Sequence, residues 1–285
     1  MGGALKRKQR GCFQCEPIVL WIMPRTLRSG AAIYILTLFL LRTTTATTLV
    51  VFYDPINGVI LAEDSSIISG HPLDIRHKIR RGEAVKATTE CKIHTCGKYI
   101  VASAGIWGNR SDRDLTLACK DIARKSSNID DFRVPFELQY VNEANRYAND
   151  LINGKEPPKV NEIMFSLAIA GFENEKAVLR YRVLRYMGVV GGKTQFKITE
   201  TLTCPGDAEC REVRKVTGLF EDIESAQKEG KYPQTPDPFR LAEQLVQIEI
   251  KAHHKTHFVL PPISVVQVNG PIAKWFRGGL CKATK

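Results

Sequence analysis

Two adjoining apolar segments near residue 50 constrain the fold of this chain most. Residues 47–53 are β-branched, apolar or aromatic throughout, and residues 59–62 form a second run of the same kind. Between them lies Asp-Pro-Ile-Asn-Gly, which favours a tight turn. Short apolar runs joined by a turn are typical of buried strands. This segment therefore predicts a β-hairpin whose buried second strand ends at Glu63 and Asp64.

The rest of the chain is predicted to alternate between strand pairs and helices. A polar stretch at residues 69–90 is interpreted as a long loop, and a polar segment with several Gly and Pro runs up to Pro238. Ser111 is a suitable N-cap for the first helix. This order predicts one domain at residues 47–285, a layered α/β structure with hairpins packed under helices. The predicted strands are 91–96, 99–104, 163–170, 177–184, 196–202 and 263–268, and the predicted helices are 111–123, 143–152 and 239–252.

Residues 23–46 have the order of a secretory signal peptide. Arg25 and Arg28 precede an apolar run of eleven residues, 31–41, and a short exit of small and polar residues follows up to Ala46. Eleven residues span about 16 Å as a helix, whereas the hydrocarbon core of a bilayer is about 30 Å thick, so we expect no stable membrane span. Residues 1–46 are therefore predicted to be an N-terminal extension and signal peptide, with Met23 as an alternative start.

The signal peptide would direct the protein to the periplasm or the extracellular space, and its removal by a cut after Ala46 would have a chemical consequence. Thr47 would then carry a free α-amine, whose pKa is about 8. A Thr hydroxyl is a weak nucleophile until a base takes its proton, and the amine of the same residue can be that base. In the alternative, the apolar run stays as an uncleaved anchor and Thr47 has no free amine.

The charge of the chain does not indicate a nucleic-acid partner. The formal net charge is +11, but residues 1–46 hold seven basic residues and one acidic residue. The remaining 34 basic and 29 acidic residues leave about +5 for the whole domain. Basic runs such as residues 77–81 are not interleaved with aromatic side chains, as a single-strand stacking platform would require.

Six cysteines after residue 46 are compatible with disulfides in an oxidising compartment. The pairs that are close in sequence are Cys91/Cys96 and Cys204/Cys210, but pairing cannot be deduced from the sequence alone. Their spacings fit a structural zinc site poorly, because the Cys91/Cys96 interval lies at the upper edge of what such sites use and the Cys204/Cys210 interval exceeds it. The histidines at 94, 253, 254 and 257 are interpreted as surface or loop residues. We therefore expect no metal site and no cofactor.

The hairpin and the residues after it resemble the opening of proteasome β subunits and of related bacterial threonine peptidases. Those proteins begin with Thr at the mature N-terminus, and the second strand of their first hairpin reads Gly-Val-Ile-x-Ala-x-Asp, as residues 58–64 do here. Their Lys-Ile/Val pair precedes an Ala-Gly turn, as Lys92-Ile93 precedes Ala104-Gly105. Residues 165–171 and 177–181 are similar to the family's central hairpin.

This resemblance to the N-terminal-nucleophile hydrolases implies an α+β fold, a four-layer αββα sandwich of two packed antiparallel sheets flanked by helices. It implies that Thr47 attacks the carbonyl of a peptide or small amide, that Lys92 keeps the amine deprotonated, and that Asp64 holds Lys92. It also implies a possible homo-oligomer, since the relatives form rings. Thr48 fits the spacing to the Asp better, but it would demand a different cut.

A second hypothesis is a binding or structural protein that keeps the scaffold without catalysis. The family's late Asp-x-x-Ser-Gly-Gly segment would fall near residues 256–261, and a Ser-Gly-Ser element near residues 204–218. Neither is present, and the loop between Asp64 and Lys92 is longer than in the family. The shell around the three predicted catalytic residues is therefore altered.

Overall fold

The predicted hairpin lies at the centre of a five-stranded antiparallel sheet, which we call the first sheet. The computed structural model describes residues 47–68, 70–105, 111–278 and 281, and all of them belong to one unit, residues 42–285. The expected signal peptide lies outside the described residues. The first sheet has the order β10-β1-β2-β11-β12. Its strands are β10 (Val213–Gly218), β1 (Thr48–Asp54), β2 (Gly58–Glu63), β11 (Ser264–Val268) and β12 (Lys274–Arg277).

A second five-stranded antiparallel sheet has the order β5-β6-β7-β8-β9. Together with the small β3–β4 pair, the described residues form three antiparallel sheets and five α-helices, so the predicted mixture of strands and helices is confirmed. The strands of the second sheet are β5 (His94–Cys96), β6 (Tyr99–Gly105), β7 (Ile163–Glu173), β8 (Lys176–Val190) and β9 (Lys193–Cys204), and those of the small pair are β3 (Ser66–Ile68) and β4 (Ala87–Thr89).

The turn of the hairpin is fixed by its own residues. Asp54 accepts hydrogen bonds at Oδ1 from the backbone N–H groups of Ile56 (2.8 Å) and Asn57 (2.6 Å), as Asp commonly does in turns. Gly58 follows with a φ of 71°, and a Cβ there would stand 2.3 Å from the carbonyl oxygen of Val268. The turn therefore requires Gly58, which sets the register of β1 on β2.

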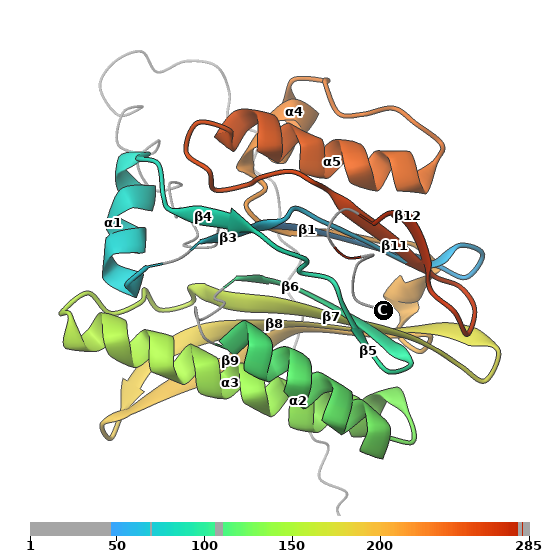
Figure 1. Ribbon diagram of the computed structural model, residues 1–285, viewed down its shortest axis with the longest axis horizontal. Coiled ribbons are helices and arrows are strands. Elements are labelled where there is room, and N and C mark those ends of the chain that lie inside the picture. Colours follow the sequence, from blue (N-terminus) through green and yellow to red (C-terminus); the bar gives the residue numbers. More distant parts are fainter. Residues whose placement is uncertain (1–46, 69, 106–110, 279–280, 282–285) are drawn as a thin grey trace, which may run out of the picture. The chain divides into compact units, whose positions relative to one another are not determined.

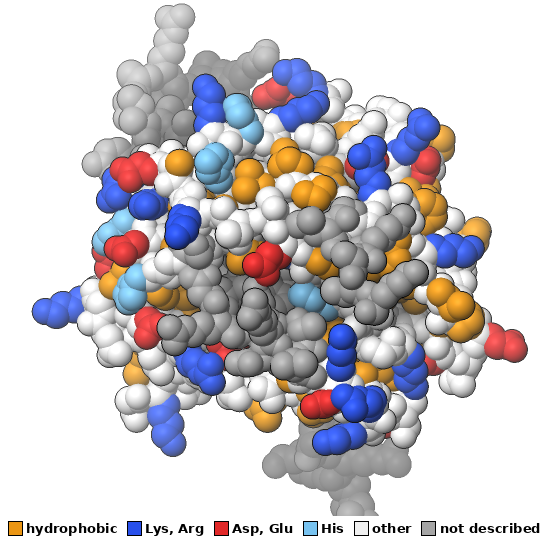
Figure 2. All heavy atoms as spheres, viewed as in Figure 1, with side chains coloured by type: hydrophobic (Ala, Val, Ile, Leu, Met, Phe, Trp, Pro, Cys, Tyr) orange, Lys and Arg blue, Asp and Glu red, His pale blue; other side chains and the backbone are white. Residues whose placement is uncertain are grey.

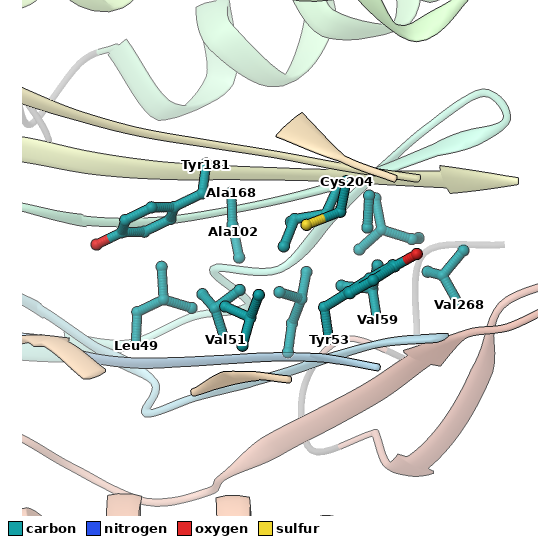
Figure 3. Close-up of a cluster of buried hydrophobic side chains, with 14 of the residues drawn as sticks. Leu49, Val51, Tyr53, Val59, Ala102, Ala168, Tyr181, Cys204 and Val268 are labelled. Carbon is teal, nitrogen blue, oxygen red and sulfur yellow. The ribbon is translucent and has the colours of Figure 1, made fainter. Parts of the chain in front are cut away.

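Alternate residues of β1 face two different cores, because side chains on a strand alternate between its faces. Leu49, Val51 and Tyr53 point toward the second sheet, where they meet residues such as Ala168 and Tyr181 (Figure 3). Val50 and Phe52 face the opposite way and pack with residues of α4 (Glu221–Lys228) and α5 (Pro238–His253). This double burial explains why β1 is apolar without a polar side.

The outer face of the second sheet is covered by α2 (Ser111–Lys125) and α3 (Ile129–Asn153), while α4 and α5 lie over the first sheet (Figure 1). Phe132, Phe136 and Tyr140 form a stripe at helical spacing on α3, with ring centroids 5.1 and 5.2 Å apart. The predicted helix at 143–152 is therefore only the end of α3. Asn128 caps the start of α3, and Pro135 lies inside this helix.

The predicted loop at residues 69–90 is wrong in its middle, where the structure has α1 (Pro72–Arg81). Pro72 stands at the first helical position, and Gly82 ends the helix with a φ of 65°. Both are ordinary helix boundary signals. The helix is tied to the domain by Arg76, which is buried and pairs with Glu162 at 2.9 Å.

Three disulfides cross-link the described residues, as export would allow. Cys204 pairs with Cys210, whereas Cys91 and Cys96 are bonded not to each other but to Cys281 and Cys119 respectively. None of the described helices is long and apolar enough to cross a membrane. On the face in Figure 2, the described Lys and Arg side chains are scattered among acidic and neutral ones, without a continuous basic stripe.

The Cys91–Cys281 bond closes a sequence separation of 190 residues, against 6 for Cys204–Cys210. In the chain-entropy model, the longer closure stabilises the fold by about 5 kcal/mol and the shorter by about 2 kcal/mol. We expect the C91S/C281S variant to lose more thermal stability than C204S/C210S, measured as Tm under non-reducing conditions. Equal losses would contradict the chain-entropy origin of the difference.

Candidate active site

Three chain segments meet where the hairpin of the first sheet opens. Thr47 precedes β1, Asp64 follows β2, and the antiparallel register pairs Leu49 with Glu63, so the two hairpin ends lie side by side. Lys92 arrives from the segment just before β5. The three residues that the sequence singled out are therefore brought together, while their catalytic roles remain a prediction.

Lys92 links the other two side chains. Its Nζ donates a hydrogen bond to Thr47 Oγ1 at 2.6 Å and lies 3.2 Å from each carboxylate oxygen of Asp64. Thr47, Asp64 and Lys92 are only 3%, 1% and 2% exposed. Buried charges are stable only when they are paired and hydrogen-bonded, so this contact holds the lysine and the aspartate in one geometry.

Asp64 is also held by the main chain. Its Oδ1 accepts from the N–H of Thr48 at 2.9 Å, and its Oδ2 accepts from Ser66 at 2.8 Å and from Leu260 at 3.4 Å. Burial raises the pKa of Asp64, while the Lys92 ammonium and the N–H donors of Thr48 and Ser66 oppose that rise. The carboxylate is thus fixed in position by donors that do not depend on side-chain type.

The two neighbouring threonines differ in what they contact. Thr47 faces Lys92, whereas Thr48 donates from its Oγ1 to the carbonyl of Leu219 at 2.9 Å. The N–H of Leu219 in turn donates to the carbonyl of Thr47 at 2.8 Å. A Cβ on Gly218 would stand 1.7 Å from that same carbonyl oxygen, so only glycine fits beside it. The hydroxyl of Thr47 therefore contacts Lys92, whereas the hydroxyl of Thr48 points away from it.

The segment at residues 256–261 lies beside the site but contributes backbone groups. The carbonyl of Leu260 accepts from the Ser65 N–H at 3.0 Å, and the carbonyl of His257 accepts from Ser66 Oγ at 3.0 Å. Together with the Leu260 N–H, these contacts connect the segment to Asp64 and its neighbours. The sequence predicted that this segment lacks the family's side chains, but it could not reveal these main-chain contacts.

Glu63 is a buried acidic residue that the sequence analysis treated only as the end of a strand. It is 0% exposed, and neither of its carboxylate oxygens makes a hydrogen bond among the described residues. Burial raises the pKa of Glu63 well above its usual value; Lys92 opposes the shift and Asp64 adds to it. The environment therefore favours the neutral acid. The sequence did contain one sign that Glu63 is unusual, because it is the single charged residue of a strand that is otherwise apolar.

Chemically, the arrangement places a hydroxyl next to an ammonium whose charge is held by a carboxylate. Such an ammonium stabilises negative charge that develops on the hydroxyl oxygen during attack on a carbonyl. All three groups come from the protein itself. The disulfide at Cys91 adjoins Lys92 in the chain and anchors this segment to Cys281.

Comparisons with known proteins do not assign a function to this site, so any functional proposal depends on the geometry described above. No family model matches the chain, and no curated protein matches it. Among solved structures, it is similar to Anbu (ancestral beta-subunit) from Yersinia bercovieri, with 12% identity and a TM-score of 0.42, over 80% of this chain and 86% of that chain. A likeness at this TM-score and identity establishes neither a shared fold nor a shared function.

The raised pKa of Glu63 predicts a particular dependence of stability on pH. A carboxyl whose pKa is higher in the folded than in the unfolded protein destabilises the fold increasingly as the pH rises above the unfolded value, about 4.3, toward the folded one. In Glu63→Gln this loss is absent, so the Tm of the variant relative to wild type should rise from pH 4 to pH 8.

The matched control is Glu209→Gln, at an exposed position, whose Tm difference from wild type should stay nearly constant over the same range. Thermal unfolding at several pH values measures both differences. A difference for Glu63→Gln that does not change with pH would show that the pKa of this carboxyl is not raised in the folded protein.

Proposed function

We propose that this protein is an exported amidohydrolase or threonine peptidase of the N-terminal-nucleophile type, which uses Thr47. The single observation that carries the proposal is the contact of 2.6 Å between Lys92 Nζ and Thr47 Oγ1 inside a buried Lys92–Asp64 pair. Included in the proposal are removal of residues 1–46, cleavage between Ala46 and Thr47, and the four-layer αββα arrangement of that family. The three disulfides are consistent with export.

In the proposed reaction, the α-amine of Thr47 takes the proton of Oγ1 as the oxygen attacks the carbonyl carbon of an amide. The tetrahedral intermediate then expels the amine leaving group, which takes up the proton from the α-ammonium. A water that the same amine deprotonates then attacks the ester on Oγ1; the bond between the acyl carbon and Oγ1 breaks, Oγ1 takes the proton back from the α-ammonium, and the carboxylic acid leaves. Lys92 stabilises the negative charge that develops on Oγ1 of Thr47 during the attack, and Asp64 holds Lys92 in place.

The substrate class follows from the proposed export. A single domain working outside the cytoplasm without an energy-driven unfoldase would accept short or unfolded peptides, or small amides. Assembly into a homo-oligomer is compatible with this proposal and is not required by it.

The alternative, a scaffold without catalysis, is favoured by one observation. Residues 256–261 approach Asp64 only through backbone groups, and they provide no carboxylate or hydroxyl side chain to the hydrogen bonds described around the site. The two proposals differ in whether Thr47 can be acylated, so the same experiment separates them.

The exported protein should begin at Thr47 and form an adduct on that residue with an electrophile that acylates hydroxyl nucleophiles, such as a β-lactone. Mass spectrometry of the intact chain and of its N-terminal peptide measures both. Thr47→Ala should abolish the adduct, and any amide hydrolysis should fall by at least about 10³-fold.

The control is Thr48→Ser, which retains the hydroxyl that bonds to Leu219 and should react like wild type. An exported chain that retains residues before Thr47 would refute the mechanism. An N-terminal Thr47 that no electrophile acylates, in a chain without activity on amides, would favour the scaffold.

The buried ion pair makes a second prediction. Lys92→Met leaves Asp64 buried without its partner and should lower the free energy of unfolding by about 3–5 kcal/mol. The double variant D64N/K92M removes both charges and should recover part of that stability while acylation of Thr47 stays lost. Denaturant unfolding together with the adduct assay checks this. A K92M variant that acylates at the wild-type rate would remove Lys92 from the mechanism.

A further inference from the structure

We propose that Asp222, Glu249 and His253 form a binding site for a divalent metal ion of the zinc type. None of the three belongs to the candidate active site, and the sequence analysis expected no metal site here. Asp222 lies in the first turn of α4, and Glu249 and His253 lie on α5. The site does not rest on the proposed function, because it would bind metal whether or not Thr47 is a nucleophile.

The two distances to His253 fit a small metal ion, and the half-exposed Asp222 side chain can turn toward Glu249 to close the third. One ligand atom from each residue lies within 4.8 Å of the other two. His253 Nε2 is 3.2 Å from Asp222 Oδ2 and 3.5 Å from Glu249 Oε2. Around a tetrahedral Zn²⁺ with bonds of about 2.0–2.1 Å, neighbouring ligand atoms stand about 3.3 Å apart. Two of the three edges of the cluster thus have the length that zinc needs.

Glu249 is the strongest indication of a ligand. Its side chain is 0% exposed, and Oε1 accepts a hydrogen bond from the N–H of Ile223 at 2.9 Å. That bond fixes the carboxylate, whose other oxygen, Oε2, faces His253 and makes no hydrogen bond among the described residues. A buried carboxylate oxygen without a hydrogen bond is costly unless a charge neutralises it.

His253 also has a polar atom without a hydrogen bond. Its Nε2 is within ion-pair distance of both carboxylates, yet it makes no hydrogen bond among the described residues. The ring nitrogen therefore does not point directly at either oxygen, as it would in a simple His–carboxylate hydrogen bond. A metal ion among the three atoms would satisfy Nε2 and both carboxylates together.

The local sequence produces this arrangement. Glu249 and His253 are four residues apart on α5, which puts both on one face of the helix. β10 ends at Gly218, and only Leu219 and Phe220 separate it from α4, so this short connection carries Asp222 to the same place. The exposed fraction of the side chain rises from 0% at Glu249 through 20% at His253 to 44% at Asp222, so the site is open to solvent on the side of Asp222.

The ligand set selects the type of ion. One imidazole and two carboxylates suit Zn²⁺, which binds three protein ligands and a water in many sites. Mg²⁺ prefers six oxygen ligands and keeps several waters, so it should bind much more weakly.

Metal at this place would connect α4 to α5 directly. The residue just before α4's N-cap, Leu219, holds the backbone of Thr47 and the hydroxyl of Thr48. The segment after α5 holds Asp64 through Leu260 and Ser66 through His257. The two helices therefore carry the two segments that close around the candidate active site, and a metal bridge would fix their relative position.

The test is Zn²⁺ binding to the untagged, metal-free protein, measured by calorimetry and by the shift in Tm. Cys12 and Cys15 are replaced by Ser in every variant, because free thiols also bind zinc. We expect one equivalent of Zn²⁺ to bind with micromolar or tighter affinity and to raise the Tm by several degrees. The same concentration of Mg²⁺ should leave the Tm unchanged.

Asp222→Asn and His253→Gln should each weaken Zn²⁺ binding at least ten-fold, while His254→Gln, at the exposed neighbouring histidine, should change it less than two-fold. Co²⁺ should give the visible absorption of a four-coordinate site, and His253→Gln should abolish it. No zinc binding, or equal binding by the H253Q and H254Q variants, would overturn the proposal and leave His253 as a partner of the two carboxylates only.

Discussion

The buried contact between Lys92 and Asp64 is the interaction on which the candidate site depends. Each charge has lost nearly all of its hydration, and only nearby opposite charge and oriented dipoles can replace it. Asp64 receives N–H groups from Thr48, Ser66 and Leu260, and Lys92 donates to Thr47. Movement of one partner leaves the other buried without the opposite charge beside it. Segments far apart in the chain are therefore held in one geometry by a single ion pair.

Much of the fold follows from the sequence where residues are buried on a strict pattern. The hairpin, the strands at 163–170 and 177–184 and the helix at 239–252 were predicted because their apolar spacing matches one period only. The elements that were missed lack that signal. β10 is half-exposed and reads as a polar segment, although it supplies the neighbour of β1. α1 is rich in charged residues, which favours a loop when only the sequence is considered, yet Pro72 and Gly82 mark its ends.

The site shows the same division. Thr47, Asp64 and Lys92 could be singled out because a predicted processing signal, a strand end and a resemblance indicated them. The encounter of Thr47 with Asp64 follows from the hairpin register, whereas Lys92 comes from the segment before β5. The role of Leu219 and Leu260 could not be foreseen, because both act through backbone groups that any residue type supplies. Asp222 meets Glu249 and His253 only through packing of α4 against α5, and a spacing of 27 residues in sequence carries no such information.

These main-chain contacts explain how Asp64 can be held in position although the side chains around it differ from those of the family that the sequence resembles. The segment at 256–261 has none of the side chains that the resemblance would require, yet its carbonyl and N–H groups reach Ser65, Ser66 and Asp64. Backbone donors survive substitution as long as the segment keeps its path. That path is fixed at one end by α5 and at the other by β11, which pairs with β2. The helices over the first sheet therefore do more than cover its apolar face, since their ends determine where the groups around Asp64 lie.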